Sequence, residues 1–253
     1  MQIDAEPLAD DEIGPLVAKG RDADVFAVRG SDDRVLRRLR RPFDLGPEAA
    51  VMEHVRVAGY PVPRVWRVGP GEMVLDRVGG PTMADDLARR PWRAAAHGRT
   101  LARLHTELHA IAAPPDLRPQ PGADGEVVLH LDLHPQNVIL APDGPVVIDW
   151  SNARRGPGAA DVADVWIVLA CLGREPGSPQ GLAARIQAAV VDRVEPAVRR
   201  RLLDAFLAGT GREEARSLLG PAAEHRLSDQ NVRPHERQQI EALVAEMAGS
   251  PDG

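Results

Sequence analysis

The chain has 253 residues and a formal net charge of −6 at pH 7, with 43% hydrophobic but only 3% aromatic side chains. This length is sufficient for one large domain or for two packed lobes. The acidic balance and the scarcity of aromatic side chains argue against a nucleic-acid-binding protein. Cys171 is the only cysteine, which excludes an intramolecular disulfide and a cysteine-based zinc site.

The longest apolar run, from Val165 to Leu172, is much shorter than the roughly 20 residues that a membrane-spanning helix needs. The acidic N-terminus, MQIDAEPLADDEIG, does not have the basic and apolar segments of a signal peptide. We therefore expect a cytoplasmic protein without a membrane partner. Lys19 is the only lysine, so chemistry that usually depends on lysine must here use Lys19 or an arginine.

The first third of the chain contains five short β-rich runs. Glycine, aspartate and serine separate the first three, which predicts an antiparallel meander. The turn Gly69-Pro70-Gly71 separates the last two and predicts a hairpin, and a helix is expected between Pro47 and Gly59. The predicted strands are residues 13–18, 25–29, 34–39, 65–68 and 73–78.

The remainder of the chain is mostly helical in pattern. Helices are predicted over 82–89 and 92–111, and again from Asp161 towards the C-terminus. The predicted breaks in this last helical part are residues 173–181, 209–211 and 228–234. Three strand-like runs interrupt the helical pattern, at 127–131, 138–140 and 146–148.

The segment VVLHLDLHPQNVILAPDGPVVID, residues 127–149, brings polar side chains to the ends of these strands. Asp132 follows the first strand, Asn137 begins the second, and Asp149 ends the third, which pairs back through the Asp143-Gly144 turn. Because a hairpin of this length returns the chain to its starting point, we expect Asp132, Asn137 and Asp149 to converge.

Two carboxylates and one amide suit the chemistry of phosphoryl transfer. Magnesium takes oxygen ligands and completes its octahedron with waters and substrate phosphates, so one carboxylate and one amide oxygen suffice from the protein. The second carboxylate is then free to accept the proton of an attacking hydroxyl group. The segment therefore predicts a magnesium-dependent phosphoryl-transfer site.

At these residues the chain resembles the aminoglycoside phosphotransferase family, which shares the protein-kinase-like fold with choline kinases. The family pattern H-G-D-L-H-P-x-N and I-D-W/F reads here HLDLHPQN (residues 130–137) and IDW (148–150). Leu131 stands where the family commonly has glycine. Further similar segments are EAAVMEHVRVAGYPVPRV (48–65), MVLDRVGGPTM (73–83), LARLHTEL (101–108) and GPGAADVAD (156–164).

The resemblance implies an α+β, bilobal fold. The nucleotide-binding lobe is expected over residues 1–78, as a small five-stranded antiparallel sheet with one helix. The larger, mainly helical lobe, residues 79–253, is expected to carry the catalytic hairpin and the acceptor site. The nucleotide would lie between the two lobes.

The resemblance also implies residue roles. Asp132 would be the catalytic base or would orient the hydroxyl group, Asn137 and Asp149 would hold Mg²⁺, and Asp161 would brace the catalytic loop. The residues expected to contact the nucleotide or its phosphates are Lys19, Gly20, Arg37, Glu48, Asp76 and Val78. Asp76 and Val78 would do so through their backbone groups.

Arg37 departs from the family, whose third strand carries a lysine that pairs with the glutamate at position 48. The exchange leaves open whether Arg37 or Lys19 contacts the phosphates, because an arginine fork is bulkier and points differently.

Four histidines near the motif carry further expectations. We expect His130 to hydrogen-bond the backbone beneath the loop and His134 to lie close to the transferring phosphoryl group. His105 and His109, one helical turn apart, are expected to pack at the end of their helix.

The predicted reaction is transfer of the ATP or GTP γ-phosphoryl group to a hydroxyl group of an aminoglycoside-like acceptor, with antibiotic resistance as a role. The alternatives are a kinase for a choline-like alcohol, a sugar or another metabolite, and a catalytically inactive nucleotide-binding protein. A protein kinase is disfavoured, because Asp149 and Asp161 leave almost no room for an activation loop. The expected partners are a nucleoside triphosphate and the small acceptor, and the chain is expected to be a monomer or a dimer.

Overall fold

The computed structural model describes residues 3, 8–20, 22–41, 43–122, 124–171, 196–228 and 234–248. In chain order the elements are η1 (Asp10–Glu12), β1 (Ile13–Lys19), β2 (Ala23–Val28), β3 (Ser31–Leu39), α1 (Gly46–Val57), β4 (Val65–Gly69), β5 (Glu72–Asp76), α2 (Met83–Arg89), η2 (Pro91–Arg93), α3 (Ala94–His109), β6 (Val127–Leu129), η3 (Pro135–Asn137), β7 (Val138–Ala141), β8 (Gly144–Val147), β9 (Arg154–Gly156), α4 (Gly158–Cys171), α6 (Arg212–Ser217), α7 (Leu219–Leu227) and α8 (Pro234–Ala248). A further helix covers residues 196–207.

The N-terminal part is a five-stranded antiparallel sheet, as predicted. Its strand order, β1-β2-β3-β5-β4, was not predicted. Strand β3 begins at Ser31, three residues before the predicted start. The reason is a tight turn in which Gly30 adopts φ +76°, so that Ser31 already pairs with Val28. The strands otherwise match the predicted runs within a few residues.

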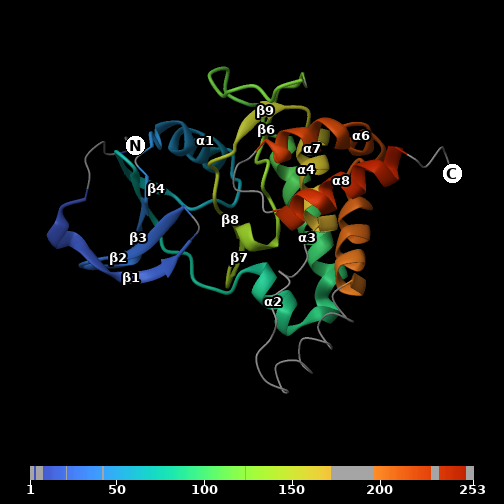
Figure 1. Ribbon diagram of the computed structural model, residues 1–253. Coiled ribbons are helices and arrows are strands. Elements are labelled where there is room, and N and C mark those ends of the chain that lie inside the picture. The colour runs from blue at the N-terminus through green and yellow to red at the C-terminus, as the bar shows by residue number, and fades with distance from the viewer. Residues whose placement is uncertain are drawn as a thin grey trace.

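Helix α1 lies against this sheet and faces the rest of the molecule (Figure 1). Pro47 lies in its first turn, and its buried face includes Val51, Met52 and Val55. Gly59, at φ +88°, follows the helix end, where the backbone N–H of Tyr60 donates to the Val55 carbonyl at 3.0 Å. The predicted helix between Pro47 and Gly59 is confirmed.

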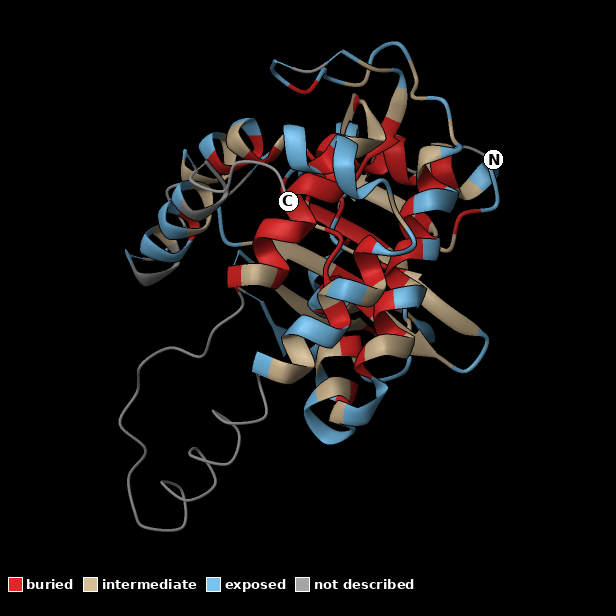
Figure 2. Ribbon diagram, turned by 90° about the vertical axis from the view of Figure 1, so that its right-hand side faces the viewer, coloured by how far each residue is buried: buried red, intermediate tan, exposed pale blue. Residues whose placement is uncertain are grey.

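The C-terminal part is mainly helical, and the buried residues gather in its middle (Figure 2). Helix α2 begins with a capping box between Thr82 and Asp85. Helix α4 is buried on nearly all sides, which explains its almost continuous apolar sequence. One apolar cluster runs from Met52 and Met73 beside the sheet to Leu104 and Ile167 in the helices. The division of the chain at residue 78 stays a prediction.

The hairpin expected around the Asp143-Gly144 turn forms as predicted, with β7 pairing antiparallel to β8. Two expected boundaries of neighbouring elements were wrong, and one strand was not expected. The predicted strand 127–131 ends at Leu129, because Leu131 takes a left-handed conformation with φ +59°. Its partner is β9, which was not predicted. The predicted helix 92–111 begins as the short turn η2 and ends at His109.

Two predicted breaks, 173–181 and most of 228–234, lie outside the described residues. None of the described helices combines the length and the apolar composition needed to cross a membrane.

Candidate active site

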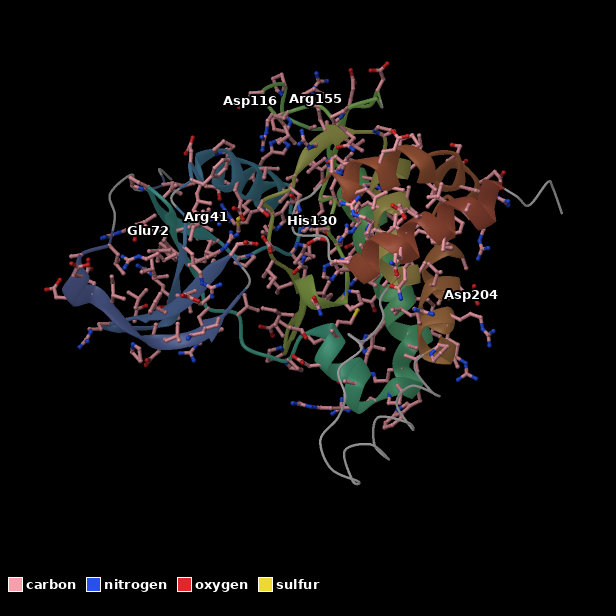
Figure 3. The ribbon with its side chains drawn as sticks, in the orientation of Figure 1. Arg41, Glu72, Asp116, His130, Arg155 and Asp204 are labelled. Carbon is pink, nitrogen blue, oxygen red and sulfur yellow. The ribbon has the colours of Figure 1, made fainter. Side chains whose placement is uncertain are left out.

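The segment from β6 to β7 forms a compact loop in the middle of the molecule. Figure 3 places His130 between the N-terminal sheet and the C-terminal helices. The His134 N–H donates to the Asp132 carbonyl at 2.9 Å, and the Asn137 N–H donates to the His134 carbonyl at 2.9 Å. Pro135 begins the short helix η3, whose last residue is Asn137. These backbone bonds fold Asn137 back onto Asp132.

The side chains of Asp132 and Asn137 are in direct contact. Asn137 Nδ2 donates to Asp132 Oδ2 at 3.0 Å and to the Asp132 carbonyl at 2.9 Å. Because Nδ2 of Asn137 donates its hydrogen bonds to Asp132, the side-chain oxygen Oδ1 remains as the atom that Asn137 can offer to a metal.

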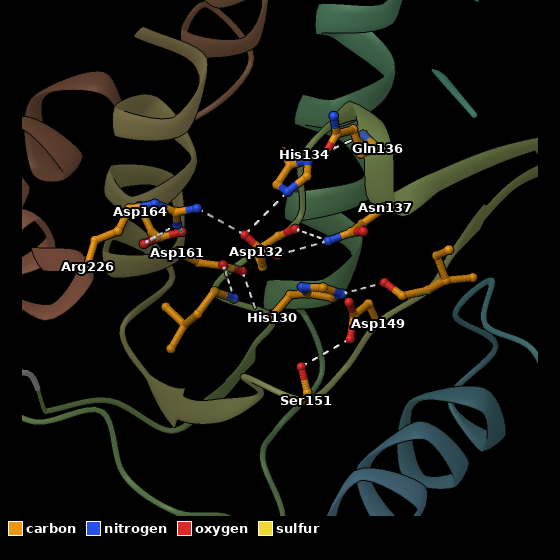
Figure 4. A network of polar contacts seen from close by, with 12 residues as sticks. His130, Asp132, His134, Gln136, Asn137, Asp149, Ser151, Asp161, Asp164 and Arg226 are labelled. Atoms are coloured by element: carbon orange, nitrogen blue, oxygen red, sulfur yellow. Dashed lines mark hydrogen bonds and ion pairs between the residues drawn. The ribbon is translucent and has the colours of Figure 1, made fainter. Parts of the chain in front are cut away.

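Asp149 is brought to the same place by the hairpin, as predicted (Figure 4). The Ile148 N–H donates to the Asn137 carbonyl at 3.0 Å, and His130 Nε2 contacts the Ile148 carbonyl at 3.1 Å. Asp149 adopts φ +65°, and Ser151 Oγ donates to Asp149 Oδ1 at 3.0 Å. The predicted backbone contact of His130 is therefore present.

Asp161, at the start of α4, braces the loop from below, as the resemblance implied. Its carboxylate accepts the N–H of His130 at 3.1 Å and that of Leu131 at 2.7 Å. His109 Nε2 lies 3.0 Å from the same carboxylate. Burial alone would raise the Asp161 pKa, but the hydrogen bond to His109 and the charges of nearby histidines hold it well below its ordinary value. His109 thus also contacts Asp161, which the sequence analysis did not predict.

The Asp132 carboxylate is strongly stabilised in its ionised form. Burial raises its pKa, but the hydrogen bond and charge of His134 and the charge of Arg226 outweigh burial and lower the pKa to about 2. His134 Nε2 lies 3.4 Å from Asp132 Oδ1. At neutral pH this carboxylate is an acceptor of hydrogen bonds and a weak base.

Arg37 lies on β3, the third strand, and its guanidinium connects two other elements. It pairs with the buried Glu48 of α1, and its Nη2 lies 3.2 Å from Asp149 Oδ1. Burial raises the Glu48 pKa, and the charge of Arg37 opposes this rise. A single guanidinium therefore connects helix α1 to the predicted metal ligand.

The other predicted nucleotide contacts lie farther along the sheet. Lys19 is exposed at the end of the edge strand β1, and Gly20 makes a tight turn in which its N–H donates to the Ala23 carbonyl at 2.8 Å. The N–H of Asp76 donates to the Arg64 carbonyl at 3.0 Å, so this group is engaged within the sheet. Val78 follows in the connection to α2.

Two polar residues of this site were missed by the sequence analysis. Arg226 of α7 contacts Asp132 at 3.3 Å and Asp164 of α4 at 3.0 Å. Asp164 lies one helical turn after Asp161, a spacing that places both on one face of α4 and was visible in the sequence. Arg226 carried no such signal, because it lies 94 residues from Asp132.

The donor set fits Mg²⁺. Asn137 and Asp149 offer oxygen atoms, the ligands that Mg²⁺ prefers, and the hairpin brings them together. Among the described residues no group of three or more His, Cys, Asp or Glu side chains has metal-binding geometry.

The comparisons with known proteins agree with this fold. APH(4)-Ia, an aminoglycoside phosphotransferase, is 17% identical with a TM-score of 0.56, covering 95% of this chain and 96% of that chain. A choline/ethanolamine kinase family protein from Mesorhizobium loti is 16% identical with a TM-score of 0.59, covering 96% of this chain and 90% of that chain. APH(2'')-Ib bound to ADP is 12% identical with a TM-score of 0.54, covering 93% and 94%.

The architecture is therefore the α+β kinase-like fold of these phosphotransferases. Residues 79–218 match the phosphotransferase enzyme family APH, and the chain belongs to this family. The comparison with curated proteins finds no match.

Proposed function

We propose that this protein is a magnesium-dependent small-molecule kinase that transfers the γ-phosphoryl group of ATP or GTP to a hydroxyl group. The observation that carries the proposal is the convergence of Asp132, Asn137 and Asp149 on one small region, with Asn137 Nδ2 3.0 Å from Asp132 Oδ2. Membership of the APH family supports the reaction class. The fold likeness to APH(2'')-Ib, whose structure holds ADP, supports a nucleotide as donor.

Asn137 Oδ1 and the Asp149 carboxylate would hold Mg²⁺, and Arg37 and Glu48 would lie beside the phosphates with Asp149. Lys19 and Gly20, at the end of β1, would lie over the nucleotide phosphates. Backbone groups of Asp76 and Val78 would hydrogen-bond the nucleobase. When bound, Mg²⁺ would supply positive charge to neutralise the negative charge that develops on the phosphate oxygens.

The Asp132 carboxylate would accept a hydrogen bond from the hydroxyl group of the acceptor. Because its pKa is about 2, it is ionised at neutral pH and too weak a base to remove the proton early. It therefore orients the hydroxyl oxygen towards the γ-phosphorus and accepts the proton late, when the new P–O bond has formed.

The acceptor we propose is an aminoglycoside-like compound, with a choline-like alcohol or a sugar as the alternative. A thermostable APH(4)-Ia variant has been solved with AMP-PNP and hygromycin B, and another similar structure belongs to the choline/ethanolamine kinase family. The acidic net charge of this chain suits a polycationic acceptor. A screen of ADP formation across aminoglycosides, amino alcohols, nucleosides and sugars decides between these classes.

The role of Asp132 has a direct test. Asp132→Asn should abolish turnover while MgATP still raises the thermal stability, because this substitution removes the proton acceptor but leaves the metal ligands. Asp149→Ala should abolish both turnover and the magnesium-dependent part of the stabilisation. Asp143→Asn, on the exposed β7–β8 turn, is the matched control and should retain activity. Near-normal phosphorylation by Asp132→Asn would refute the proposed role.

A further inference from the structure

Arg226 reaches the Asp132 carboxylate from a helix distant in the sequence. Its Nη2 lies 3.3 Å from Asp132 Oδ1, and its Nη1 lies 3.2 and 3.0 Å from the two oxygens of Asp164 (Figure 4). We propose that Arg226 is a positioning residue that fixes the orientation of the Asp132 carboxylate, and that Asp164 anchors Arg226. This inference rests on the proposed function, in which Asp132 orients the acceptor hydroxyl group.

The contacts of Asp132 come from two sides. Asn137 holds Oδ2 from within the catalytic loop, whereas Arg226 contacts Oδ1 from α7. His134 also faces Oδ1, at 3.4 Å. Rotation of the carboxylate would break the contact at one oxygen or the other. The plane of the Asp132 carboxylate is therefore fixed by the loop on one side and by helix α7 on the other.

Asp164 makes Arg226 a fixed part of the site. The Asp164 side chain is 4% exposed and that of Arg226 is 25% exposed. A buried carboxylate without a partner is strongly unfavourable, so Asp164 holds the guanidinium in place. The planar fork of arginine lets one nitrogen face Asp164 while the other faces Asp132, which a lysine ammonium cannot do in the same geometry.

The helices bring Arg226 into position by close packing. Ala222 and Ala223 of α7 are buried, and helix α7 packs against α4. These small side chains lie one turn before Arg226 on the same helix face and allow α7 to approach α4 closely. Arg226 is thereby placed beside Asp164.

The electrostatics agree with this geometry. Burial, together with the charges of Asp132 and Asp161, raises the Asp164 pKa to about 7, although the charge and the hydrogen bond of Arg226 oppose the rise. His225 of α7 and Asp164 both line one small cavity. Burial would lower the Arg226 pKa, but the charges of Asp164 and Asp132 raise it. Arg226 therefore remains charged where it meets Asp132.

The first test does not depend on turnover. In a double-mutant cycle on urea unfolding of the full chain, Arg226→Gln and Asp132→Asn should be coupled by about tenfold in the unfolding equilibrium constant, because the two side chains touch. Coupling below twofold would overturn the contact. Arg216→Gln, an exposed arginine of α6, should show no coupling to Asp132→Asn and serves as the matched control.

The second test asks whether Arg226 positions Asp132 or only stabilises the fold. It measures kcat and KM for MgATP hydrolysis, in which water takes the place of the acceptor. Arg226→Gln should lower kcat by about 10- to 100-fold with the KM for MgATP changed less than twofold. Arg226→Lys should recover part of the loss, because it keeps the charge. An unchanged kcat in Arg226→Gln, or a loss confined to KM, would overturn the proposal.

Two controls keep these outcomes distinct. If Arg226→Gln fails to fold, the combination with Asp164→Asn removes both buried charges, and this double variant should fold and still show the lowered kcat. If the wild-type protein does not turn over MgATP under any condition, the proposed function fails. The coupling between Arg226 and Asp132 then decides by itself whether α7 holds this carboxylate.

Discussion

Asp161 holds the backbone of the loop between β6 and β7. Leu131 adopts φ +59°, a conformation that is unfavourable for a bulky side chain and that glycine, common here in the family, would adopt freely. The loop nevertheless keeps this conformation, because Asp161 accepts the N–H groups of both His130 and Leu131. Asp132, the next residue, is positioned by this strained backbone.

Asp161→Asn should lower the free energy of unfolding by on the order of 3 kcal/mol at pH 7, because it weakens three hydrogen bonds to a buried charged group. The loss should be measured by urea unfolding at several pH values. Asp204→Asn, at an exposed position with a long 3.6 Å ion pair, is the control and should change stability by less than about 0.5 kcal/mol.

The pH dependence of this effect has a defined sign. The pKa of Asp161 is lower in the folded state than its ordinary value of 3.8. Its charge therefore contributes stability that is fully present above pH 4 and is lost as the pH falls towards the folded pKa. The difference between the wild type and Asp161→Asn should narrow below pH 4. A difference that stayed constant on acidification would show that the charge of Asp161 contributes nothing.

The predicted site residues and the missed ones differ in how far along the chain their contact partners lie. Asp132, Asn137 and Asp149 lie on one hairpin and the loop that leads into it, so local pairing rules suffice to bring them together. His109 meets Asp161 across 52 residues, and Arg226 meets Asp132 across 94 residues. Such contacts depend on how helices pack, and one sequence contains no periodicity that specifies the partner.

At the scale of elements, α3 and the helix over residues 196–207 pack unusually closely. A Cβ added to Gly98 would lie 2.4 Å from the Leu202 carbonyl oxygen and 2.8 Å from Ala205 Cβ. Ala102 lies one turn farther along α3, 2.7 Å from the place where a Cβ on Gly209 would be. Small residues on the facing surfaces therefore determine the distance between these helices.

Gly98→Ala should lower the free energy of unfolding by about 2–3 kcal/mol, because the added methyl group meets backbone atoms that cannot move without shifting a helix. Differential scanning calorimetry should show this as a fall in Tm of roughly 5–10 °C. The matched control is Gly220→Ala in α7, where an added Cβ meets nothing within 4 Å. There the better helix propensity of alanine should leave stability unchanged or raise it by up to about 1 kcal/mol. Equal Tm values for the two variants would refute the packing argument.

Strand β9 is an element that could not be predicted from the sequence. Its residues, Arg154–Gly156, have neither the alternation nor the composition of a strand, and it forms because β6 offers an unpaired edge. The five strands of the N-terminal sheet, in contrast, were predicted, since their turns carry glycine and the strands β-branched residues. The pairing of β3 with β5, which joins them into one sheet, was not predicted from these local signals. Local chemistry specifies an element only where its partner is also close in the sequence.

At the scale of the whole molecule, the two parts of the chain share one core. The apolar cluster includes Val65 and Met73 from the sheet and Leu104 and Trp150 from the helical part. Tyr60, which follows α1, connects them directly. Its hydroxyl group donates to the Leu104 carbonyl at 3.1 Å, and its ring meets that of Trp150 edge-on at 5.7 Å.

A shared core of this kind predicts that the chain unfolds as a single cooperative unit, although the fold is bilobal. Calorimetry should show one transition with a calorimetric enthalpy close to the van't Hoff enthalpy. Tyr60→Phe removes the hydrogen bond to Leu104 but keeps the ring contact, so it should lower the free energy of unfolding by about 1 kcal/mol. Because Tyr60 contributes to both parts, that variant should shift the whole transition without splitting it. Two separate transitions, in the wild type or in Tyr60→Phe, would instead mean that the sheet and the helical part are stable independently of each other.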